Sequence, residues 1–437
     1  MTASKHLILE LNAFEGGRTG TPKDPLLQRR LRNAGSASVL FYRQPIELVS
    51  AQGAWVVAAG GKRYLDFYNN VPSVGHCHPR VVFAVADQMS KLNINTRYLN
   101  ARVEDYIDRL KATLPEALSN VILACSGSEA NDLAMRIAVK ATGGTGFIVT
   151  DSAYHGNTAW VTDLSPAALK RRALPEHVVS IPAPGHLGVK PHETGKAFAA
   201  ALQRAVRELK SRGHKLAAFI CDSIFSSDGI FADPAGFLAP AVEATRKAGG
   251  LYIADEVQPG FARSGEAFWG FSRHGVMPDV VTMGKPMGNG FPMSGMATRP
   301  ELLDSFCRDV GYFNTFGGNP VAAAAGRAVL DIIDDEGLQE NALNVGKYLK
   351  QRLGDLAETN ARIGSVRGAG LFLGIDIDRD GEPDAHGAVR IIDALKDRGI
   401  LIGAAGPHAN TLKVRPPLCL KREEADFFAD ALTAAAR

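Results

Sequence analysis

The chain has 437 residues, of which 46% are hydrophobic, 22% charged and 7% aromatic, which is the composition of a globular protein of two or three domains. Its 49 Lys and Arg residues against 46 Asp and Glu residues leave a net charge of +3, so nothing marks a nucleic-acid-binding or membrane-surface protein. No stretch approaches the roughly 18 apolar residues of a transmembrane helix. The apolar run within MTASKHLILELNAFEGG is too short to predict a signal peptide.

Cysteine usage indicates a reducing compartment. The five cysteines are scattered and form no CxxC pair: Cys77, Cys125, Cys221, Cys307 and Cys419. We therefore expect a cytoplasmic protein without a disulfide framework or a zinc site. His76 and His78 are the one close histidine pair, but they lack the H-E-x-x-H spacing, and no metal is expected.

The first part of the chain, residues 1–75, is predicted to be an arm followed by a β meander. The meander lies in IELVSAQGAWVVAAGGKRYLDF, where short β-rich runs are broken by glycines and polar turns. From about residue 79 the pattern changes to helical periodicity, beginning with RVVFAVADQMSKL. We expect this meander to form part of a small domain.

Residues 76–325 are predicted to form a large domain in which short apolar strands alternate with helices. The predicted strands are NVILACS, GFIVT, HVVSIP, LAAFICD, GLYIAD and DVVTMG, and the clearest helices are EANDLAMRIAVKA and GKAFAAALQRAVRELKSR. Continuous apolar strands with intervening helices favour a mostly parallel sheet that is covered on both faces.

Residues 326–437 are predicted to form a second α/β unit, with two helices, the strand LFLGIDI, a helix, GILIG, TLKVRPPL and a final helix. The predicted fold class is therefore α/β. A large domain with a mostly parallel sheet is flanked by helices, and a smaller α/β domain is built from both chain ends.

Ligands of such sheets bind beyond the carboxyl ends of the strands, and the residues there suggest chemistry. Ser126-Gly127-Ser128 follows NVILAC and opens a helix, where free N–H groups and a hydroxyl suit a phosphate. The alternative is an ordinary helix cap provided by Ser126. The segment is neither a Walker loop nor a dinucleotide fingerprint.

Three further strand ends carry candidate residues, each with an ordinary structural alternative. Asp255 ends GLYIAD and could either cap the next element or pair with a cationic ring nitrogen. Lys285 follows DVVTMG, where Pro286 favours an extended conformation; a desolvated lysine there is a competent nucleophile. Tyr154, in Tyr154-His155-Gly156, could stack on a planar ligand or fill the core.

The combination indicates one cofactor. Pyridoxal 5′-phosphate requires a phosphate anchor, a ring stack, a carboxylate on the pyridine nitrogen and a lysine that forms an aldimine. The four candidate segments supply these contacts at the ends of successive strands of one domain.

The same segments resemble the class III pyridoxal-phosphate-dependent aminotransferases of fold type I. The resemblance runs over nearly the whole chain and rests on SGSEAND, AYHGNT, IADEVQPGFARSG, MGKPMGNG and FNTFGGNPV. It implies that Lys285 forms the internal aldimine and moves protons, and that Asp255 keeps the pyridine nitrogen protonated. It also implies that Gln258 contacts the ring hydroxyl and that Tyr154 stacks on the ring with His155 beside it.

The resemblance further implies contacts to phosphate and substrate. Ser126, Gly127 and Ser128 would bind the cofactor phosphate, and Thr315 would reach the phosphate of the neighbouring subunit, which implies a homodimer. Arg415 in VRPPL matches an arginine that grips a substrate carboxylate.

One departure concerns Asp222. Many family members have Glu-Pro after the strand that precedes DEVQ, and that glutamate can pair with the carboxylate-binding arginine. This chain has Asp222-Ser223, one methylene shorter, which leaves the pairing of Asp222 with Arg415 open.

Within the family, NNVPSVGHCHP, YHGNT, VTMGKPMGNG and RPPLC resemble the branch of alanine–glyoxylate-aminotransferase-like proteins, which includes ethanolamine-phosphate phospho-lyases. We predict an aminotransferase that moves an amino group from an amine or amino acid to a 2-oxo acid. The alternative is a phospho-lyase that eliminates phosphate and ammonia from O-phosphoethanolamine or a phosphohydroxylysine-like substrate. A binding protein that kept the fold and lost the chemistry is disfavoured by the intact Asp255 and Lys285.

Overall fold

A seven-stranded sheet forms the centre of the computed structural model, which describes residues 11, 13–14, 24–170 and 172–437. Its strand order is β4-β10-β9-β8-β7-β5-β6, and β10 alone runs antiparallel to its two neighbours. The strands are β4 (Asn120–Ala124), β5 (Gly146–Thr150), β6 (Val178–Ile181), β7 (Leu216–Cys221), β8 (Leu251–Asp255), β9 (Val280–Met283) and β10 (Ser294–Thr298).

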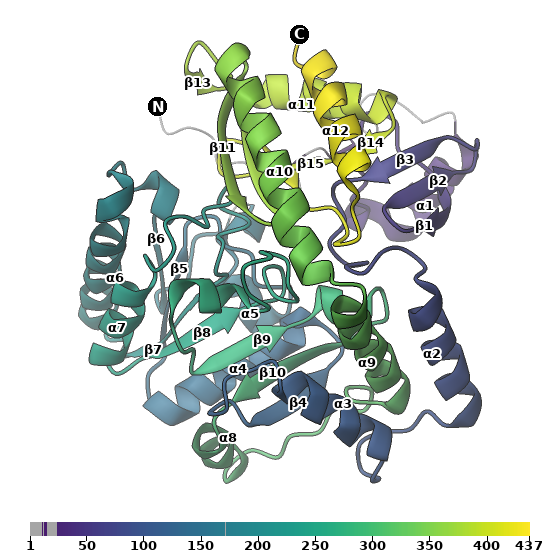
Figure 1. The fold of residues 1–437 in the computed structure, drawn as a ribbon. Coiled ribbons are helices and arrows are strands. Elements are labelled where there is room, and N and C mark those ends of the chain that lie inside the picture. The colour runs from purple at the N-terminus through teal and green to yellow at the C-terminus, as the bar shows by residue number, and fades with distance from the viewer. Residues whose placement is uncertain (1–10, 12, 15–23, 171) are drawn as a thin grey trace.

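Helices cover both faces of this sheet, as the mostly parallel sheet requires. On β7, Phe219 and Cys221 belong to the apolar cluster that contains residues of α6 and α7, whereas Ala218 and Ile220 belong to the cluster of α4. Alternate residues of a strand point to opposite faces, so α4 lies opposite α6 and α7. These helices are α4 (Gly127–Thr142), α6 (Thr194–Ser211), α7 (Ala239–Lys247) and, packed on α4, α8 (Pro300–Cys307) (Figure 1).

Both chain ends meet in a second, four-stranded sheet. It contains β1 (Leu48–Gln52), β2 (Trp55–Ala58), β3 (Arg63–Asp66) and β14 (Ile400–Leu401). Strand β3 runs parallel to β14, with Leu65 opposite Ile400. The purple and yellow ribbons lie side by side at the top of Figure 1 for this reason.

A third sheet comes from the C-terminal region. Its order is β11-β12-β16-β15, and β13 pairs with β12. These strands are β11 (Ile363–Ala369), β12 (Phe372–Arg379), β13 (Glu382–Pro383), β15 (Gly403–Ala405) and β16 (Thr411–Val414), with α10 (Leu338–Thr359), α11 (Ala385–Asp397) and α12 (Arg422–Ala435) beside them (Figure 1). The α/β class and the mostly parallel central sheet are confirmed. The domain limits at residues 75 and 325 stay predictions, and residue 325 lies inside α9 (Pro320–Asp335).

The remaining helices connect these parts. Both α2 (Pro79–Lys91) and α3 (Ala101–Lys111) pack on α9. Shorter elements are α1 (Pro25–Ala34), α5 (Ala159–Asp163), η1 (Gly35–Ala37), η2 (Pro166–Ala168), η3 (Pro184–His186), η4 (Pro191–Glu193), η5 (Gly270–His274) and η6 (Lys285–Gly288).

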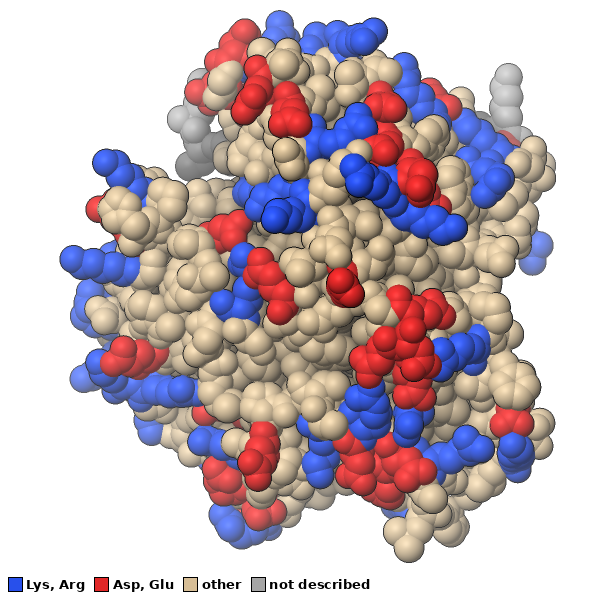
Figure 2. All heavy atoms as spheres, in the orientation of Figure 1, with Lys and Arg blue, Asp and Glu red and all other residues tan. Residues whose placement is uncertain are grey.

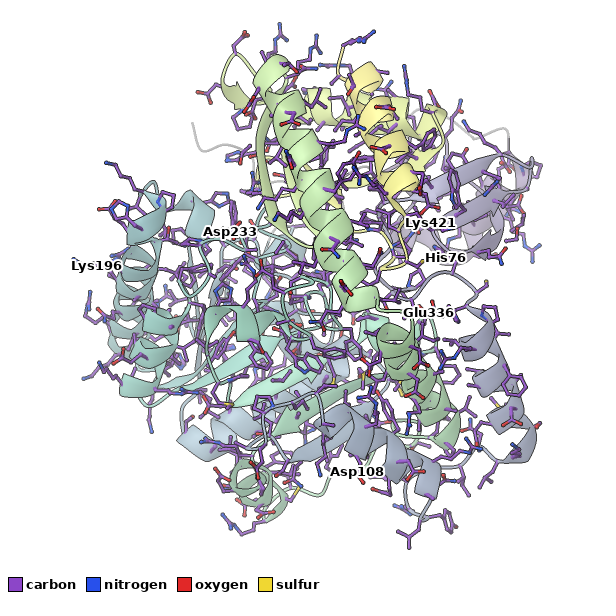
Figure 3. All side chains as sticks on the ribbon, viewed as in Figure 1. His76, Asp108, Lys196, Asp233, Glu336 and Lys421 are labelled. Atoms are coloured by element: carbon purple, nitrogen blue, oxygen red, sulfur yellow. The ribbon has the colours of Figure 1, made fainter. Side chains whose placement is uncertain are left out.

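The two histidines of GHCHP have separate partners. His76 Nε2 lies 2.8 Å from Asp66 Oδ2, and His78 Nε2 lies 3.0 Å from Glu336 Oε1. Figure 3 labels His76 and Glu336 where α9 meets α10 near the N-terminal sheet. Within the described residues, no group of three His, Cys, Asp or Glu side chains has the geometry to hold a metal ion.

The surface mixes charges of both signs. On the face drawn in Figure 2, basic and acidic side chains are interspersed over the surface among other residues, in keeping with the small net charge. No helix in the described part of the chain has the length and apolarity needed to cross a membrane.

Candidate active site

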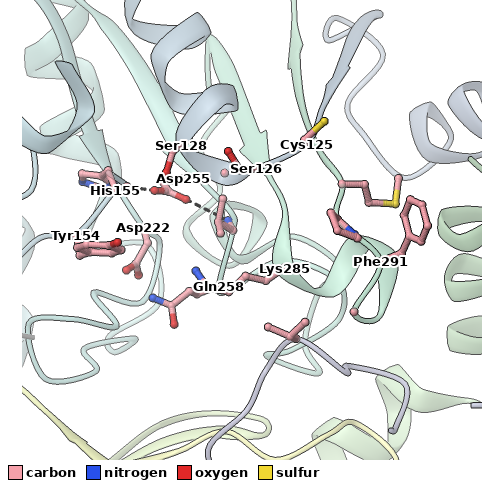
Figure 4. Close-up of a pocket in the computed structure, with 17 residues that line it drawn as sticks. Cys125, Ser126, Ser128, Tyr154, His155, Asp222, Asp255, Gln258, Lys285 and Phe291 are labelled. Carbon is pink, nitrogen blue, oxygen red and sulfur yellow. Dashed lines mark hydrogen bonds and ion pairs between the residues drawn. The ribbon is translucent and has the colours of Figure 1, made fainter. Parts of the chain in front are cut away.

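A cavity of about 340 Å³ lies where β4, β5, β7, β8 and β9 end. Nine of the predicted site residues line it together: Ser126, Gly127, Ser128, Tyr154, His155, Asp222, Asp255, Gln258 and Lys285. Figure 4 shows most of them converging from these strand ends. Val71, Cys125 and the wall formed by residues 290–293 also line the cavity and had no predicted role. Cys125 directly follows β4 at a strand end, whereas Val71 and residues 290–293 lie away from the ends of the parallel strands.

The first turn of α4 forms one end of the cavity. Ser126 is the N-cap and accepts from Glu129 N at 3.3 Å, while Glu129 Oε2 accepts from Ser126 N at 2.8 Å, a capping box. The Ser126 hydroxyl therefore caps the helix. The backbone N–H groups of Gly127 and Ser128 have no acceptor among the described residues, and the positive end of the helix dipole faces the cavity with them.

The loop after β5 packs directly against this turn. Ser128 Oγ donates to Asn157 Oδ1 at 3.0 Å and accepts from Asn157 N at 3.1 Å. Gly156, with φ of 144°, comes so close that a Cβ atom there would lie 2.4 Å from Ser128 Oγ. This contact fixes Tyr154 and His155 relative to the helix start.

Asp255 ends β8 with only 4% of its surface exposed, and its carboxylate is held from three sides. Oδ2 lies 2.6 Å from His155 Nδ1 and accepts from Asn131 Nδ2 at 3.0 Å, and Oδ1 accepts from Val257 N at 3.1 Å. Asn131 is fixed in turn by Thr282, whose Oγ1 donates to Asn131 Oδ1 at 2.6 Å. These bonds offset the cost of burying the charge. Asn131, in SGSEAND, had no predicted role.

Lys285 follows β9 and opens the short η6 turn instead of continuing the predicted extended segment. Its φ of 21° is unusual for a residue with a side chain and is typical of functional sites. Burial lowers the pKa of the Lys285 amine to about 8, although Asp255 acts in the opposite direction; the nearby Arg415 lowers it further. Lys285 is therefore easier to deprotonate than an ordinary lysine.

Arg415 does not line the cavity itself but contacts a residue that does. The residue is 9% exposed, and its Nη1 donates to Gln258 Oε1 at 2.6 Å and to Asn70 Oδ1 at 3.3 Å. It also lies over the ring of Tyr68, 4.5 Å from the centroid.

Asp222 does not pair directly with Arg415, which answers the question left open by the sequence. Its carboxylate accepts from Ile224 N at 3.0 Å and from Ser226 Oγ at 2.8 Å. Ser226 Oγ accepts from Gln258 Nε2 at 2.7 Å. Asp222 and Arg415 are therefore connected through Ser226 and Gln258.

One predicted residue lies outside the cavity, and one buried residue near Arg415 was not predicted. Thr315 is exposed and is not among the residues that line the cavity. Lys413 was missed; it is 3% exposed on β16, and burial and Arg415 hold the pKa of its amine well below the ordinary value. The alternation in LKVRPPL could have identified it, because residues two apart on a strand share a face.

Comparisons with known protein families and solved structures agree with this fold. The family model described as "Aminotransferase class-III" matches residues 41–436. The chain therefore belongs to the class III aminotransferases and is an enzyme.

Its relatives carry two kinds of name. A Drosophila melanogaster protein named alanine–glyoxylate aminotransferase 2-like is 39% identical over 93% of this chain and 85% of its own. A Caenorhabditis elegans protein named ethanolamine-phosphate phospho-lyase homolog 1 is 38% identical over 91% and 90%. The solved structure of a phospholyase from Arthrobacter in complex with phosphoethanolamine is 44% identical, covers 94% of this chain and 99% of its own, and has a TM-score of 0.90.

The prediction of a cytoplasmic protein is contradicted. An Arabidopsis thaliana relative, 39% identical over 95% of this chain and 87% of its own, is named as a mitochondrial protein. The prediction depended on unpaired cysteines, and these indicate only a reducing environment. Because other compartments share that environment, the cysteines do not distinguish them.

The cofactor of the enzyme is pyridoxal 5′-phosphate. The cavity fits such a group. A Cβ atom at Gly127 would lie 3.1 Å from Val257 Cγ2, a tight contact. The bare backbone of Gly127 therefore lets a phosphate approach its N–H group closely. The fixed carboxylate of Asp255 suits a protonated ring nitrogen, and the amine of Lys285 suits an aldehyde.

Proposed function

We propose that this enzyme transfers an amino group from an amine or amino acid to a 2-oxo acid. The observation that carries this proposal is Arg415, a buried guanidinium beside the cavity with amide oxygens as its acceptors. A planar cation in this position suits the bidentate recognition of a substrate carboxylate.

In this proposal each residue has one task. The cofactor supplies the electron sink that makes the substrate Cα–H acidic. Lys285 Nζ takes that proton and returns it to a different carbon. This requires that the amine can lose its proton near neutral pH. Asp255, held by His155 and Asn131, keeps a proton on the ring nitrogen. Gly127 and Ser128 bind the cofactor phosphate.

Elimination of phosphate from a phosphorylated amine is the second candidate. The specific observation in its favour is the 44% identity to the Arthrobacter phospholyase, whose solved structure contains phosphoethanolamine. Lys285 would take the same proton, the Cβ–O bond would break, and phosphate would leave with the electron pair of that bond. Arg415 would then face a phosphate group in place of a carboxylate.

We also propose that the protein is a homodimer in which Thr315 reaches the cofactor phosphate of the other copy. Leu99 is 100% exposed and Phe316 72% exposed. Their two loops border one groove of about 250 Å³, which Thr96 and Phe313 help to line. Large apolar side chains at such a groove favour a partner surface.

Two assays on the same holoenzyme test the proposed function. One measures keto-acid-dependent consumption of amino donors, and the other measures phosphate release from O-phosphoethanolamine and phosphohydroxylysine without any keto acid. Acceptor-dependent amino transfer without phosphate release supports the first candidate, and stoichiometric phosphate and ammonia release replaces it by the second. Lys285→Ala must abolish either activity; turnover by this variant would contradict both.

A further inference from the structure

Arg415 is a buried cation without a carboxylate partner. Its Nε is buried and has no hydrogen-bond acceptor within the described part of the chain. Its acceptors are the side-chain amide oxygens of Gln258 and Asn70. Buried guanidinium groups ordinarily pair with carboxylates, so the neutral partners of Arg415 require an explanation.

The nearby carboxylates are engaged elsewhere. Asp222 accepts hydrogen bonds from Ile224 N, Ser226 N and Ser226 Oγ. Asp66, whose charge acts on Arg415 from a distance, accepts from Tyr68 N and contacts His76. Neither carboxylate forms an ion pair with the guanidinium, and its positive charge remains available.

The orientation of the Gln258 amide follows from this arrangement. Burial raises the pKa of Asp222, but the hydrogen bonds from Ser226 and Ile224 favour its ionised form. In that form it can only accept, so Ser226 Oγ donates its one proton to Asp222. Ser226 Oγ must then accept from Gln258, which requires Gln258 Nε2 on that side. Oε1 consequently faces Arg415 and accepts from its Nη1. Asp222 thus sets the direction of the hydrogen bonds that run from Arg415 through Gln258 and Ser226 to Asp222, which we call the series.

We propose that Asp222, Ser226 and Gln258 act as positioning residues that hold Arg415 ready for the anionic group of the substrate, a carboxylate or a phosphate monoester. Gln258 fixes the guanidinium without neutralising it, so an incoming anion displaces only a neutral amide. The inference depends on the proposed function in one respect, namely that Arg415 faces the anionic end of the substrate.

The test measures anion binding to the holoenzyme by isothermal titration calorimetry, with inorganic phosphate and pyruvate as separate probes. In the holoenzyme the cofactor's own phosphate would occupy the start of α4, as proposed above, so added anions would report on the substrate side. Tighter binding of phosphate than of pyruvate would identify a phosphate monoester as the substrate group, and the reverse would identify a carboxylate. The absence of binding by wild type, or equal binding by Arg415→Met, would overturn the inference.

The direction in which Asp222→Asn changes the Kd of the anion distinguishes two roles for Asp222. If Asp222 were only a nearby negative charge, its removal would tighten anion binding. If Asp222 orients the amide through Ser226, the introduced side-chain amide donates to Ser226 Oγ, and the amide of Gln258 turns its Nε2 toward Arg415. We expect the Kd of the bound anion to rise about three- to tenfold; an unchanged or lower Kd contradicts the inference.

Matched variants complete the experiment. Asp228→Asn replaces a buried aspartate of the same loop that lies outside the series, and the Kd of this variant should not rise. Gln258→Glu should raise the Kd more than tenfold, because the new carboxylate neutralises Arg415. If Asp222→Asn fails to fold, Ser226→Ala interrupts the series at its middle and must also raise the Kd. Anion binding can be measured without turnover, so the two proposals fail separately. Arg415-dependent anion binding without catalysis would reject the proposed function alone. Catalysis by the wild type, together with an unchanged Kd in Asp222→Asn and Ser226→Ala, would reject this inference alone.

Discussion

The reactivity of Lys285 depends on whether its amine carries a proton. Burial lowers the pKa of its amine to about 8, and only the neutral amine attacks the aldehyde of the cofactor. We expect the rate constant for covalent capture of added cofactor by the apoenzyme to rise with pH, to reach half of its maximum near pH 8, and to fall about tenfold per unit below that. Stopped-flow absorbance measures it. Lys285→Ala should show no capture phase, and a midpoint near pH 10 would contradict the prediction.

Asp228 is a residue whose protonation affects stability. It is buried between Thr150 and Ser152, and burial raises its pKa to about 7. Because its unfolded pKa is near 3.9, the folded chain binds this proton more tightly, and the associated stability is lost as pH rises from about 4 through about 7.

Replacing Asp228 by Asn should therefore make stability less sensitive to pH. The fall in melting temperature between pH 5 and pH 8 should be smaller in Asp228→Asn than in wild type, by about 2 °C or more. Differential scanning calorimetry measures it, with the exposed Asp105→Asn as control. If the fall in melting temperature between pH 5 and pH 8 is the same in Asp228→Asn and in wild type, Asp228 is already ionised at pH 5.

Among the elements, the β5–α5 loop approaches the first turn of α4 too closely for a side chain at Gly156. Gly156 has φ of 144°, and a Cβ atom there would lie 2.9 Å from the Cα and 2.4 Å from the Oγ of Ser128. Gly156→Ala should displace Ser128 and weaken cofactor binding at least tenfold, measured by fluorescence titration. Gly188→Ala is the matched control, since Gly188 has φ of 66° but nothing within 4 Å. Equal losses in both variants would assign the effect to backbone strain alone.

The elements themselves were largely predictable. Six of the seven strands of the central sheet were predicted because each is a continuous apolar run. Strand β10 was missed because its sequence, Ser-Gly-Met-Ala-Thr, carries small side chains in a fully buried strand. There the packing of both faces replaces the β-branched pattern that sequence analysis requires.

The site was predictable only in part. Strand-end residues such as Asp255 and Lys285 follow from topology, because parallel strands end at one edge. The bond from Arg415 to Gln258 joins residues 157 positions apart, and the hydrogen-bond direction that Asp222 sets depends on side-chain conformations. No local pattern in the sequence encodes either one.

For the whole molecule, the proposed dimer makes a direct prediction. The double variant Leu99→Glu, Phe316→Glu places charges on both loops of the groove, and a dimer interface does not tolerate buried unpaired charge. Light scattering should give twice the 46.6 kDa of the chain for wild type and the single mass for the variant. Because Thr315 is predicted to reach the other copy, cofactor affinity should fall as well. Val49→Glu, on the exposed strand β1, should remain dimeric; a monomeric wild type would contradict the proposal.

The parallel pairing of β3 with β14 has a consequence for how the chain folds as it is synthesised. Leu65 leaves the ribosome 335 residues before its partner Ile400, which at roughly 5–20 residues per second is a delay of about 17–67 s. During that time the edge of β3 is unpaired, and unpaired edges attract other strands. The N-terminal meander therefore carries an exposed strand edge through most of synthesis, because its partner β14 (Ile400–Leu401) is made after nine tenths of the 437 residues.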